Sequence, residues 1–477
     1  MVFIKIKRAF FLTQVLSLLI FSVPVLLSFF GYRVLHDKWI LNTGILGIFF
    51  SAQISSILPF LLDFLNCKKK YFQVTILLGF IGLAVLLLFF TNSRSSWIGL
   101  LAALIALAYL SDVHKVIKKI SIFSPFLFIC VSFLFAFSFK VKSSAGRVFI
   151  YKISSKIFKD NWVTGIGIGK YKVQHNEYQA SYFSRNSIDS KEAILADNTY
   201  YAFNELWQLL IELGLLKFVL VVFGFSMLIK FLVQFVPSQE NRSLYSAGLS
   251  SLVCVFAASL FSYPFHSVPI VLQVLLCCIV VVHVVANEYN SNKALASVAK
   301  YLRALFLICF FIVGYFGLSS LVRKNEVEVA INMGKAGNHQ KAIQEFHSLY
   351  IKHSLDGLAT FEYARELYHS NMLDEAKQVI LKAKQSYVSN ELYRILARIE
   401  EELKNVKDAE RNYKWAVYMV PNRMVSRFDL MNFYVRQNDT TNAIYWAKSI
   451  INMPVKIPSN ITEHLKKQAN GVVKSLE

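Results

Sequence analysis

Residues 196–216 read ADNTYYAFNELWQLLIELGLL, where a polar segment runs into an apolar helix. The helical half keeps four polar side chains among residues otherwise suited to lipid: Asn204, Glu205, Gln208 and Glu212. At 3.6 residues per turn, positions 205, 208 and 212 share one face, and position 204 stands beside 208. Carboxylates and amides within a membrane span are costly and normally face a bundle interior or a wet cavity. The stripe therefore predicts a site on the protein-facing side of a membrane helix.

The whole chain is too apolar for a soluble protein. Of its 477 residues, 55% are hydrophobic and 15% aromatic, and the mean hydropathy is +0.45. Windows of about 20 apolar residues predict membrane spans. They lie near residues 9–31, 39–65, 71–90, 96–111, 120–139, 205–236, 244–263, 266–286 and 302–322. The predicted fold class is all-α, with a polytopic membrane helix bundle of about nine spans over residues 1–323.

Basic residues orient these spans. Most lysines and arginines of the short loops fall on one side: Lys5, Lys7, Arg8, Lys68, Lys69, Lys70, Lys115, Lys118, Lys119, Lys230, Arg242, Lys293 and Lys300. Short loops rich in Lys and Arg stay in the cytoplasm. The N-terminus is therefore predicted to be cytoplasmic. The long segment 140–204, with ten basic and five acidic residues, is predicted to be an extracytoplasmic loop, and the C-terminus also faces outward.

From about residue 324 the composition turns soluble and a repeat appears. Ala342, Ala376, Ala409 and Ala443 follow one another at intervals of 34, 33 and 34 residues. This is the period of tetratricopeptide helical hairpins, in which a small residue lies where two helices approach closely. Residues 324–477 are thus predicted to form an α-solenoid of tetratricopeptide-like repeats outside the cytoplasm. It would serve as a docking surface for a protein partner or acceptor, or alternatively as a spacer.

Several function classes do not fit the sequence. The net charge is +21, but the basic residues lie in short loops and in the long segment, without the continuous basic groove that nucleic-acid binding needs. The six cysteines lack metal-ligand spacing, so no metal site is predicted. Gly165, Gly167 and Gly169 superficially resemble a nucleotide loop, yet no strand and helix unit surrounds them. We interpret these glycines as a flexible or tightly turning backbone and predict no cofactor.

Two arginines are candidates for binding an anion. Arg94 stands at the outer end of the fourth span, among serines suited to capping a helix. Free backbone amides and the helix dipole there would favour a phosphate, although an interfacial anchor is the common role of an arginine at a span end. Arg147 follows Gly146 in the long segment, and its guanidinium could bind two oxygens of a diphosphate.

Three outward-side residues are candidates for a general base: His175, His266 and Glu205. Such a group must reach the hydroxyl proton that it removes, and a sequence does not give that distance. For His266, in the short SYPFHS loop, a capping or interface role is an alternative. For His175, in VQHNEY, the alternative is a solvated loop histidine.

Taken in order, these motifs resemble the O-antigen ligase superfamily. They are SRSSW at 93–97, the Gly-Arg pair at 146–147, GIGIGKY at 165–171 and FNELWQLLIELGLL at 203–216. The resemblance covers roughly residues 91–290. The superfamily includes lipopolysaccharide O-antigen ligases, O-antigen polymerases and bacterial protein O-oligosaccharyltransferases, and a tetratricopeptide extension occurs in it.

The resemblance implies inverting glycosyl transfer at the periplasmic face of the bacterial inner membrane. The donor is an undecaprenyl-diphosphate-linked glycan, and the acceptor is a hydroxyl of lipid A-core, of a protein or of a growing glycan. Arg94 and Arg147 would bind the leaving diphosphate, with Asn204, Gln208 and Glu212 as further substrate-binding residues. The usual His-Asn pair of the family aligns with Phe203-Asn204 here, so Glu205, His175 or His266 would replace the missing base. The alternative is a non-catalytic membrane scaffold that recruits envelope proteins through its repeats.

Overall fold

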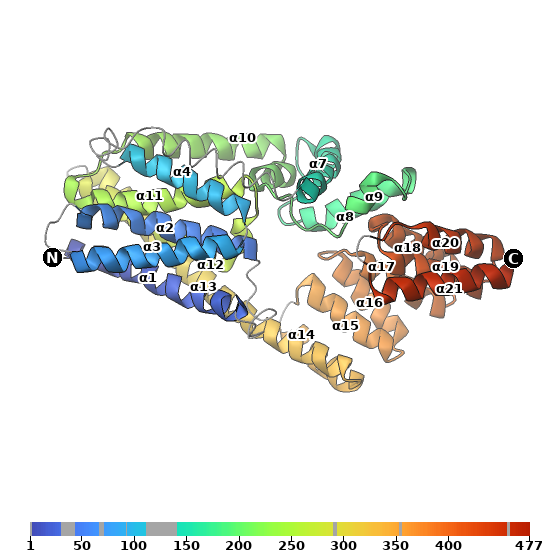
Figure 1. Cartoon of the computed structure of the whole chain (residues 1–477). Helices are drawn as coiled ribbons and strands as arrows, with labels where there is room; N and C mark the ends of the chain where they lie inside the picture. The colour runs from blue at the N-terminus through green and yellow to red at the C-terminus, as the bar shows by residue number, and fades with distance from the viewer. Residues whose placement is uncertain are drawn as a thin grey trace. The chain divides into compact units, whose positions relative to one another are not determined.

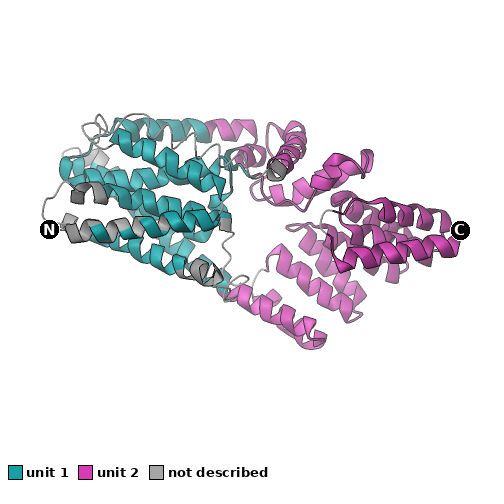
Figure 2. Ribbon diagram, in the orientation of Figure 1, with its two compact units in different colours: residues 1–141, 203–206, 221–321 teal, residues 142–202, 207–220, 322–477 magenta. Residues whose placement is uncertain are grey.

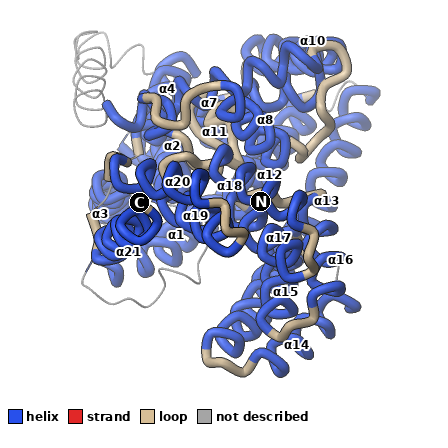
Figure 3. Tube along the Cα trace, turned by 90° about the vertical axis from the view of Figure 1, so that its right-hand side faces the viewer, coloured by secondary structure: helices blue, strands red, loops and turns tan. Residues whose placement is uncertain are grey.

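The computed structural model describes residues 2–29, 43–65, 71–91, 93–110, 141–289, 293–352, 355–455 and 458–477. Within these ranges every regular element is a helix, which confirms the predicted all-α class (Figure 3). The chain divides into two compact units (Figure 2). The first comprises residues 1–141, 203–206 and 221–321, and the second comprises residues 142–202, 207–220 and 322–477.

The first unit is a bundle of apolar helices (Figure 1). Helix α11 packs against α2, α4 and α12, and α2 also packs against α3 and α1. Helices α10 and α13 run through both units. The helices that contribute to this unit are α1 Val2–Phe29, α2 Thr43–Leu65, α3 Tyr71–Thr91, α4 Arg94–Leu110, α10 Glu205–Gln234, α11 Gln239–Ser259, α12 Val268–Glu288 and α13 Lys293–Lys335.

These helices make the protein a membrane protein. Eight of the nine predicted spans overlap a helix, and the remaining one, the fifth span at 120–139, lies outside the described residues. Three described helices are long and apolar enough to cross a bilayer: Glu205–Gln234, Val268–Glu288 and Ala296–Lys335. Gly44–Phe60 and Arg94–Leu110 are shorter apolar helices. The number of spans therefore stays a prediction.

Amide side chains tie the bundle together internally. The Gln273 Nε2 donates to Gln14 Oε1 at 2.9 Å, and the Gln53 Nε2 donates to Gln273 Oε1 at 3.2 Å. All three glutamines are buried. Because lipid offers no hydrogen-bond partners, side-chain amides inside a membrane bundle pair with one another across helices. This cluster links α1, α2 and α12.

The second unit joins the long segment to the C-terminal helices. Residues 140–204, predicted as a loop, are mostly helical: α7 Val141–Asn161, α8 Tyr171–Arg185 and α9 Lys191–Leu195. The C-terminal helices are α14 His339–Lys352, α15 Gly357–His369, α16 Leu373–Lys384, α17 Asn390–Glu402, α18 Val406–Met419, α19 Met424–Arg436, α20 Thr440–Asn452 and α21 Asn460–Leu476. Consecutive helices of this set pack against each other.

The repeat of alanines has a structural cause. Ala342, Ala376, Ala409 and Ala443 are all fully buried, as expected for small residues at a close approach of two helices. Some helices in this region begin at a capping residue that the sequence supplies. The hydroxyl of Ser389 accepts from the Leu392 N–H at 3.1 Å and begins α17. The tetratricopeptide identity of these hairpins stays a prediction.

Candidate active site

Helix α10 is broken at Gly214, where φ is +74° and ψ is +169°. The glycine turn predicted at 165–169 lies against this break. The Gly167 N–H donates to Glu212 O at 3.0 Å, and the Leu215 N–H donates to Trp162 O at 2.7 Å. These bonds satisfy backbone groups that the interrupted helix leaves open. Gly165, Gly167 and Gly169 have φ of +71°, +94° and +75°, so their predicted tight turning is confirmed.

The polar stripe of α10 is used in part to hold this turn. Glu212 is buried, and its carboxylate accepts from the Gly169 N–H at 3.0 Å and from the Tyr171 N–H at 3.3 Å. Gln208 donates to the same carboxylate at 3.3 Å and accepts from the Ala202 N–H at 3.1 Å. Because Tyr171 is the first residue of α8, the negative charge lies at the positive end of a helix dipole. As the stripe predicts, these two side chains face protein rather than lipid.

Glu205 lies at the start of α10 and faces a histidine. Its Oε1 accepts from the Phe265 N–H at 3.1 Å, and its Oε2 lies 3.8 Å from the His266 Nε2. His266 ends the short 3₁₀ helix η1, Pro264–His266. The Glu205 side chain is 15% exposed and the His266 side chain 38% exposed. A carboxylate fixed by the main chain beside an accessible imidazole is an arrangement that can transfer a proton.

The residue that precedes Asn204 and Glu205 has an unusual backbone conformation. Phe203 has φ of +56°, a left-handed conformation uncommon for an aromatic residue. Its ring packs edge-on against Tyr263, with 5.3 Å between ring centroids. Ser267, which follows His266, has a buried hydroxyl without a hydrogen-bond partner in the described structure. Strained backbone of this kind clusters at functional sites. The sequence does not predict the positive φ of Phe203, because aromatic residues rarely adopt the left-handed conformation. Asn204 lies between Phe203 and Glu205, partly exposed.

Arg94 begins α4, as the sequence predicts. The adjoining Ser93 hydroxyl donates to Gly44 O at 3.0 Å and so ties the start of α4 to the start of α2. Gly47 permits this approach, because a Cβ there would lie 2.4 Å from the Ser96 Oγ. The Arg94 side chain is partly exposed at the start of this helix. Amides at a helix start and a guanidinium together favour an anion.

Arg147 and His175 lie in helices of the second unit. Arg147 is partly exposed in α7. Burial raises the pKa of Tyr151, and the positive charge of Arg147 opposes part of that rise. His175 is fully buried in α8, 5.5 Å from the Tyr171 ring, so the solvated-loop interpretation is wrong. Burial lowers the pKa of His175 to about 4. Neither ring nitrogen has a hydrogen bond of good geometry among the described residues. The imidazole is therefore a neutral, buried group at pH 7.

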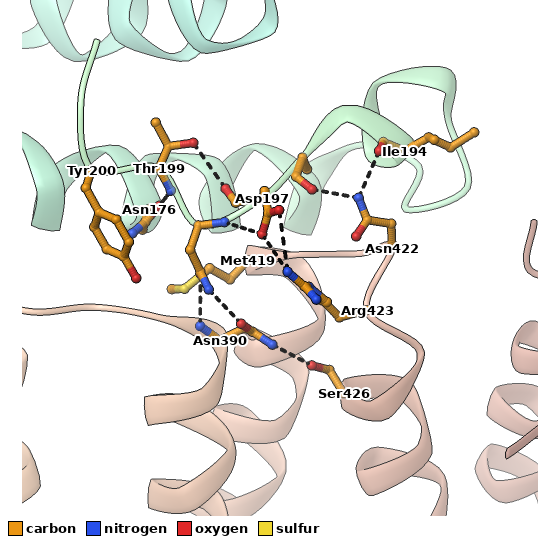
Figure 4. A network of polar contacts seen from close by, with 12 residues as sticks. Asn176, Ile194, Asp197, Thr199, Tyr200, Asn390, Met419, Asn422, Arg423 and Ser426 are labelled. Carbon is orange, nitrogen blue, oxygen red and sulfur yellow. Dashed lines mark hydrogen bonds and ion pairs between the residues drawn. The ribbon is translucent and has the colours of Figure 1, made fainter. Parts of the chain in front are cut away.

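The C-terminal helices bind the segment that leads into α10 (Figure 4). The Asn176 Nδ2 of α8 donates to Val388 O at 2.8 Å, and its Oδ1 accepts from the Thr199 N–H at 2.8 Å. The Asn198 Nδ2 donates to Asn390 Oδ1 at 2.9 Å. These bonds fix residues 198–199, shortly before Asn204 and Glu205 in the chain.

A second group of contacts holds α9 and the residues around it. The Asn422 Nδ2 donates to the carbonyls of Ala193, Ile194 and Ala196 at 3.1, 2.9 and 2.6 Å (Figure 4). Arg427 is almost fully buried, and its guanidinium donates to Asp189 Oδ1 at 2.8 Å and to Ile188 O at 3.0 Å. An arginine buried in this way is stabilised only while its partners stay in place. The C-terminal helices therefore position much of the long segment.

The fold and this site define a helical membrane protein with a carboxylate–imidazole pair at the start of a membrane helix. Residues 78–222 match the model of the O-antigen ligase family. The match spans Arg94, Arg147 and Glu205, and it confirms the resemblance to the O-antigen ligase superfamily. Residues 78–222 are thus similar to the O-antigen ligase family, whose members are glycosyltransferase-like ligases and polymerases. No curated protein matches the chain significantly.

Proposed function

We propose that this protein is an inner-membrane glycosyltransferase. It transfers a glycan from undecaprenyl diphosphate to an acceptor hydroxyl at the periplasmic face. The family match supports the reaction class. The observation that carries the proposal is the pair formed by Glu205 and His266 at the start of α10, with 3.8 Å between Oε2 and Nε2. It supplies a proton acceptor where Phe203 stands in place of the histidine usual in the family.

In the proposed reaction the acceptor oxygen forms a bond to the anomeric carbon of the glycan. The bond between that carbon and the diphosphate oxygen breaks, and the hydroxyl proton passes to the base. His266 is the exposed member of the pair and takes the proton, while Glu205 holds the imidazole and stabilises its positive charge. The leaving diphosphate gains negative charge, so Arg94 and Arg147 stabilise the transition state electrostatically.

The other candidate residues are proposed to bind the substrate or to hold the backbone near it. Asn204, beside Glu205, is proposed to bind the glycan or diphosphate directly. Gln208 and Glu212 are proposed to act on the substrate through the glycine turn that they hold. His175 is buried with its pKa lowered to about 4, so the proposal gives it no part in proton transfer.

We favour lipid A-core as the acceptor, because the matched family is described as O-antigen ligase and the resemblance implies that such ligases act on lipid A-core. Transfer to a protein hydroxyl or to a growing O-antigen chain uses the same donor and differs in the acceptor alone. The proposed periplasmic repeats are compatible with a large acceptor.

The test is transfer by the purified full chain in proteoliposomes that contain the lipid-linked glycan and a candidate acceptor. His266→Ala should lower the rate by about 10²- to 10⁴-fold, the usual contribution of a general base. Glu205→Gln should also lower the rate, because the imidazole then loses the carboxylate that holds it and stabilises its positive charge. Arg94→Ala and Arg147→Ala should also lower it. Glu463→Gln, at an exposed glutamate of α21, is the matched control and should leave the rate unchanged. Equal rates for Glu205→Gln and the control would remove Glu205 from the mechanism.

The rival function, a non-catalytic scaffold, makes the opposite prediction for the same variants. A scaffold needs the bundle and the repeats but no proton acceptor at the start of α10. Glu205→Gln would then restore the wild-type phenotype to a deletion strain, whereas the glycosyltransferase proposal predicts that it fails to do so.

A further inference from the structure

An apolar patch is exposed where the long segment meets α10. It consists of Trp162, Val163, Ile168, Leu215 and Leu216, and we call it the turn patch. Trp162 is 52% exposed and Ile168 is 77% exposed. Large apolar side chains exposed together in this way mark a surface that binds another apolar phase. The proposed transfer reaction uses none of these five side chains.

The turn patch is fixed to α10 by backbone bonds. The Leu215 N–H donates to Trp162 O at 2.7 Å, and the Ile166 N–H donates to Ile211 O at 3.1 Å. Lys217 Nζ donates to Thr164 O at 3.3 Å. The turn therefore keeps its position along α10, next to residues 211–217, wherever that helix sits in a membrane.

The patch continues directly into an exposed apolar surface of α10. From Leu215 to Gln234, α10 has 20 residues after the break at Gly214, enough to cross the hydrocarbon core of a bilayer at about 1.5 Å per residue. The most apolar 18-residue window of this span has none of its residues buried in protein. Since Leu215 and Leu216 begin this stretch, a bilayer crossed by it would place the turn at the depth where the helix enters, the depth at which tryptophans are enriched.

The charges around the patch suit lipid headgroups. Lys159, in the last turn of α7, and Lys217, which directly follows Leu216, are both exposed. The nearby carboxylate of Asp160 accepts from the Tyr178 hydroxyl at 3.1 Å. An apolar surface bordered by lysines is the composition of segments that lie in a membrane interface and bind anionic lipid.

We propose that the turn patch is an interfacial anchor that inserts Trp162 and Ile168 into the headgroup region of the bilayer. Its partner is bulk phospholipid, and Lys159 and Lys217 give it a preference for anionic headgroups. The anchor sets the depth of the glycine turn and, through Glu212, the start of α8.

The experiment places a photoreactive residue on the patch. Ile168 is replaced by p-benzoylphenylalanine (Ile168→Bpa) in the full chain, which is reconstituted in vesicles of synthetic phosphatidylethanolamine and phosphatidylglycerol without any polyprenyl lipid. The matched control is Ile461→Bpa, because Ile461 is 67% exposed in α21, at the far end of the repeats. After irradiation, intact-mass and peptide analysis identify the adducts.

A phospholipid adduct at position 168, at least several-fold above the yield at position 461, is the expected result. Equal yields at the two positions, or no lipid adduct at position 168, would overturn the proposal. Adducts that form only after polyprenyl diphosphate lipid is added would identify a donor-binding surface and would also overturn it. None of these outcomes depends on glycosyl transfer, so the proposed function stands or fails separately.

A second comparison tests the charge preference. Raising the anionic lipid fraction should raise the adduct yield at position 168 in the wild-type background. In the Lys159→Gln, Lys217→Gln background that increase should shrink or disappear, with the total lipid adduct retained. An undiminished increase would show that the two lysines do not select the headgroup.

Discussion

Single residues decide which polar side chains of the stripe are available for chemistry. Glu205 has one oxygen on the Phe265 N–H and the other facing His266, whereas both oxygens of Glu212 accept from backbone amides of the glycine turn. A sequence predicts that these carboxylates avoid lipid, because that follows from helical periodicity. It does not separate the two roles, because the turn residues that bind Glu212 lie more than 40 positions away in the chain.

The burial of His175 is likewise not predicted by the sequence, and it has a testable consequence. Its pKa is lowered from 6.5 to about 4 by burial, so protonation favours the unfolded state. The stabilisation is complete above pH 6.5 and is lost as the pH falls toward 4, by about 3 kcal/mol in total at about 1.36 kcal/mol per pH unit. The melting temperature of the full chain in detergent should therefore fall between pH 7 and pH 5.

The variant His175→Phe should lose much of this acid sensitivity, because it keeps the buried ring and removes the titrating group. His464→Phe, at an exposed histidine of α21, is the control and should melt with the wild-type pH dependence. If the His175→Phe chain kept the full acid sensitivity, the buried imidazole would not be its source.

At the scale of elements, the break in α10 is the feature that shapes the site. The sequence predicts one continuous span at 205–236, since a glycine inside an apolar run is compatible with a membrane helix. The structure divides it at Gly214 into a polar start that holds the turn and an apolar remainder. The break depends on contacts with residues 162–167, and helical periodicity alone does not predict these contacts.

Gly214→Ala should disrupt this junction. A Cβ at that position would lie 2.3 Å from Val163 O and 2.5 Å from the Gly165 N, and φ of +74° with ψ of +169° is accessible almost only to glycine. We expect a loss of about 3 kcal/mol in stability, seen as a lower melting temperature and faster proteolysis near residues 161–170.

The matched control for this change is in the same helix. Gly224→Ala adds the same methyl group where no other atom lies within 4 Å, and alanine favours a helix over glycine. It should leave the melting temperature unchanged or slightly higher. Similar losses in the two variants would mean that the turn does not depend on the glycine.

For the whole molecule, the second unit shows how the C-terminal helices hold the long segment. The period of the alanines predicts helical hairpins, and their burial agrees with that spacing. The sequence suggests a docking surface for a partner, whereas the structure shows that part of the surface is bound to residues 176–199 of the same chain. Side-chain bonds between residues some 200 positions apart leave no pattern in a single sequence.

Asn422→Ala tests this role of the repeats. It removes a donor from three carbonyls around α9, which should cost about 1–3 kcal/mol locally. Limited proteolysis of the full chain should cut residues 186–197 faster, and glycosyl transfer should fall with it. Asn470→Ala, at an exposed asparagine of α21, should change neither. Unchanged cleavage in Asn422→Ala would contradict the proposed positioning.

The most direct measurement of the central claim compares a deletion strain carrying the wild-type gene, the Glu205→Gln variant or an empty vector. Lipid-linked glycan is quantified, and lipopolysaccharide and glycoproteins are resolved on gels. We predict that the glycan accumulates and that lipopolysaccharide loses it with both the empty vector and Glu205→Gln, while the variant reaches the membrane in normal amount. Loss of the glycan from glycoproteins instead would identify a protein as the acceptor. Unchanged glycan pools and acceptors in all three strains would contradict the assignment as a glycosyltransferase.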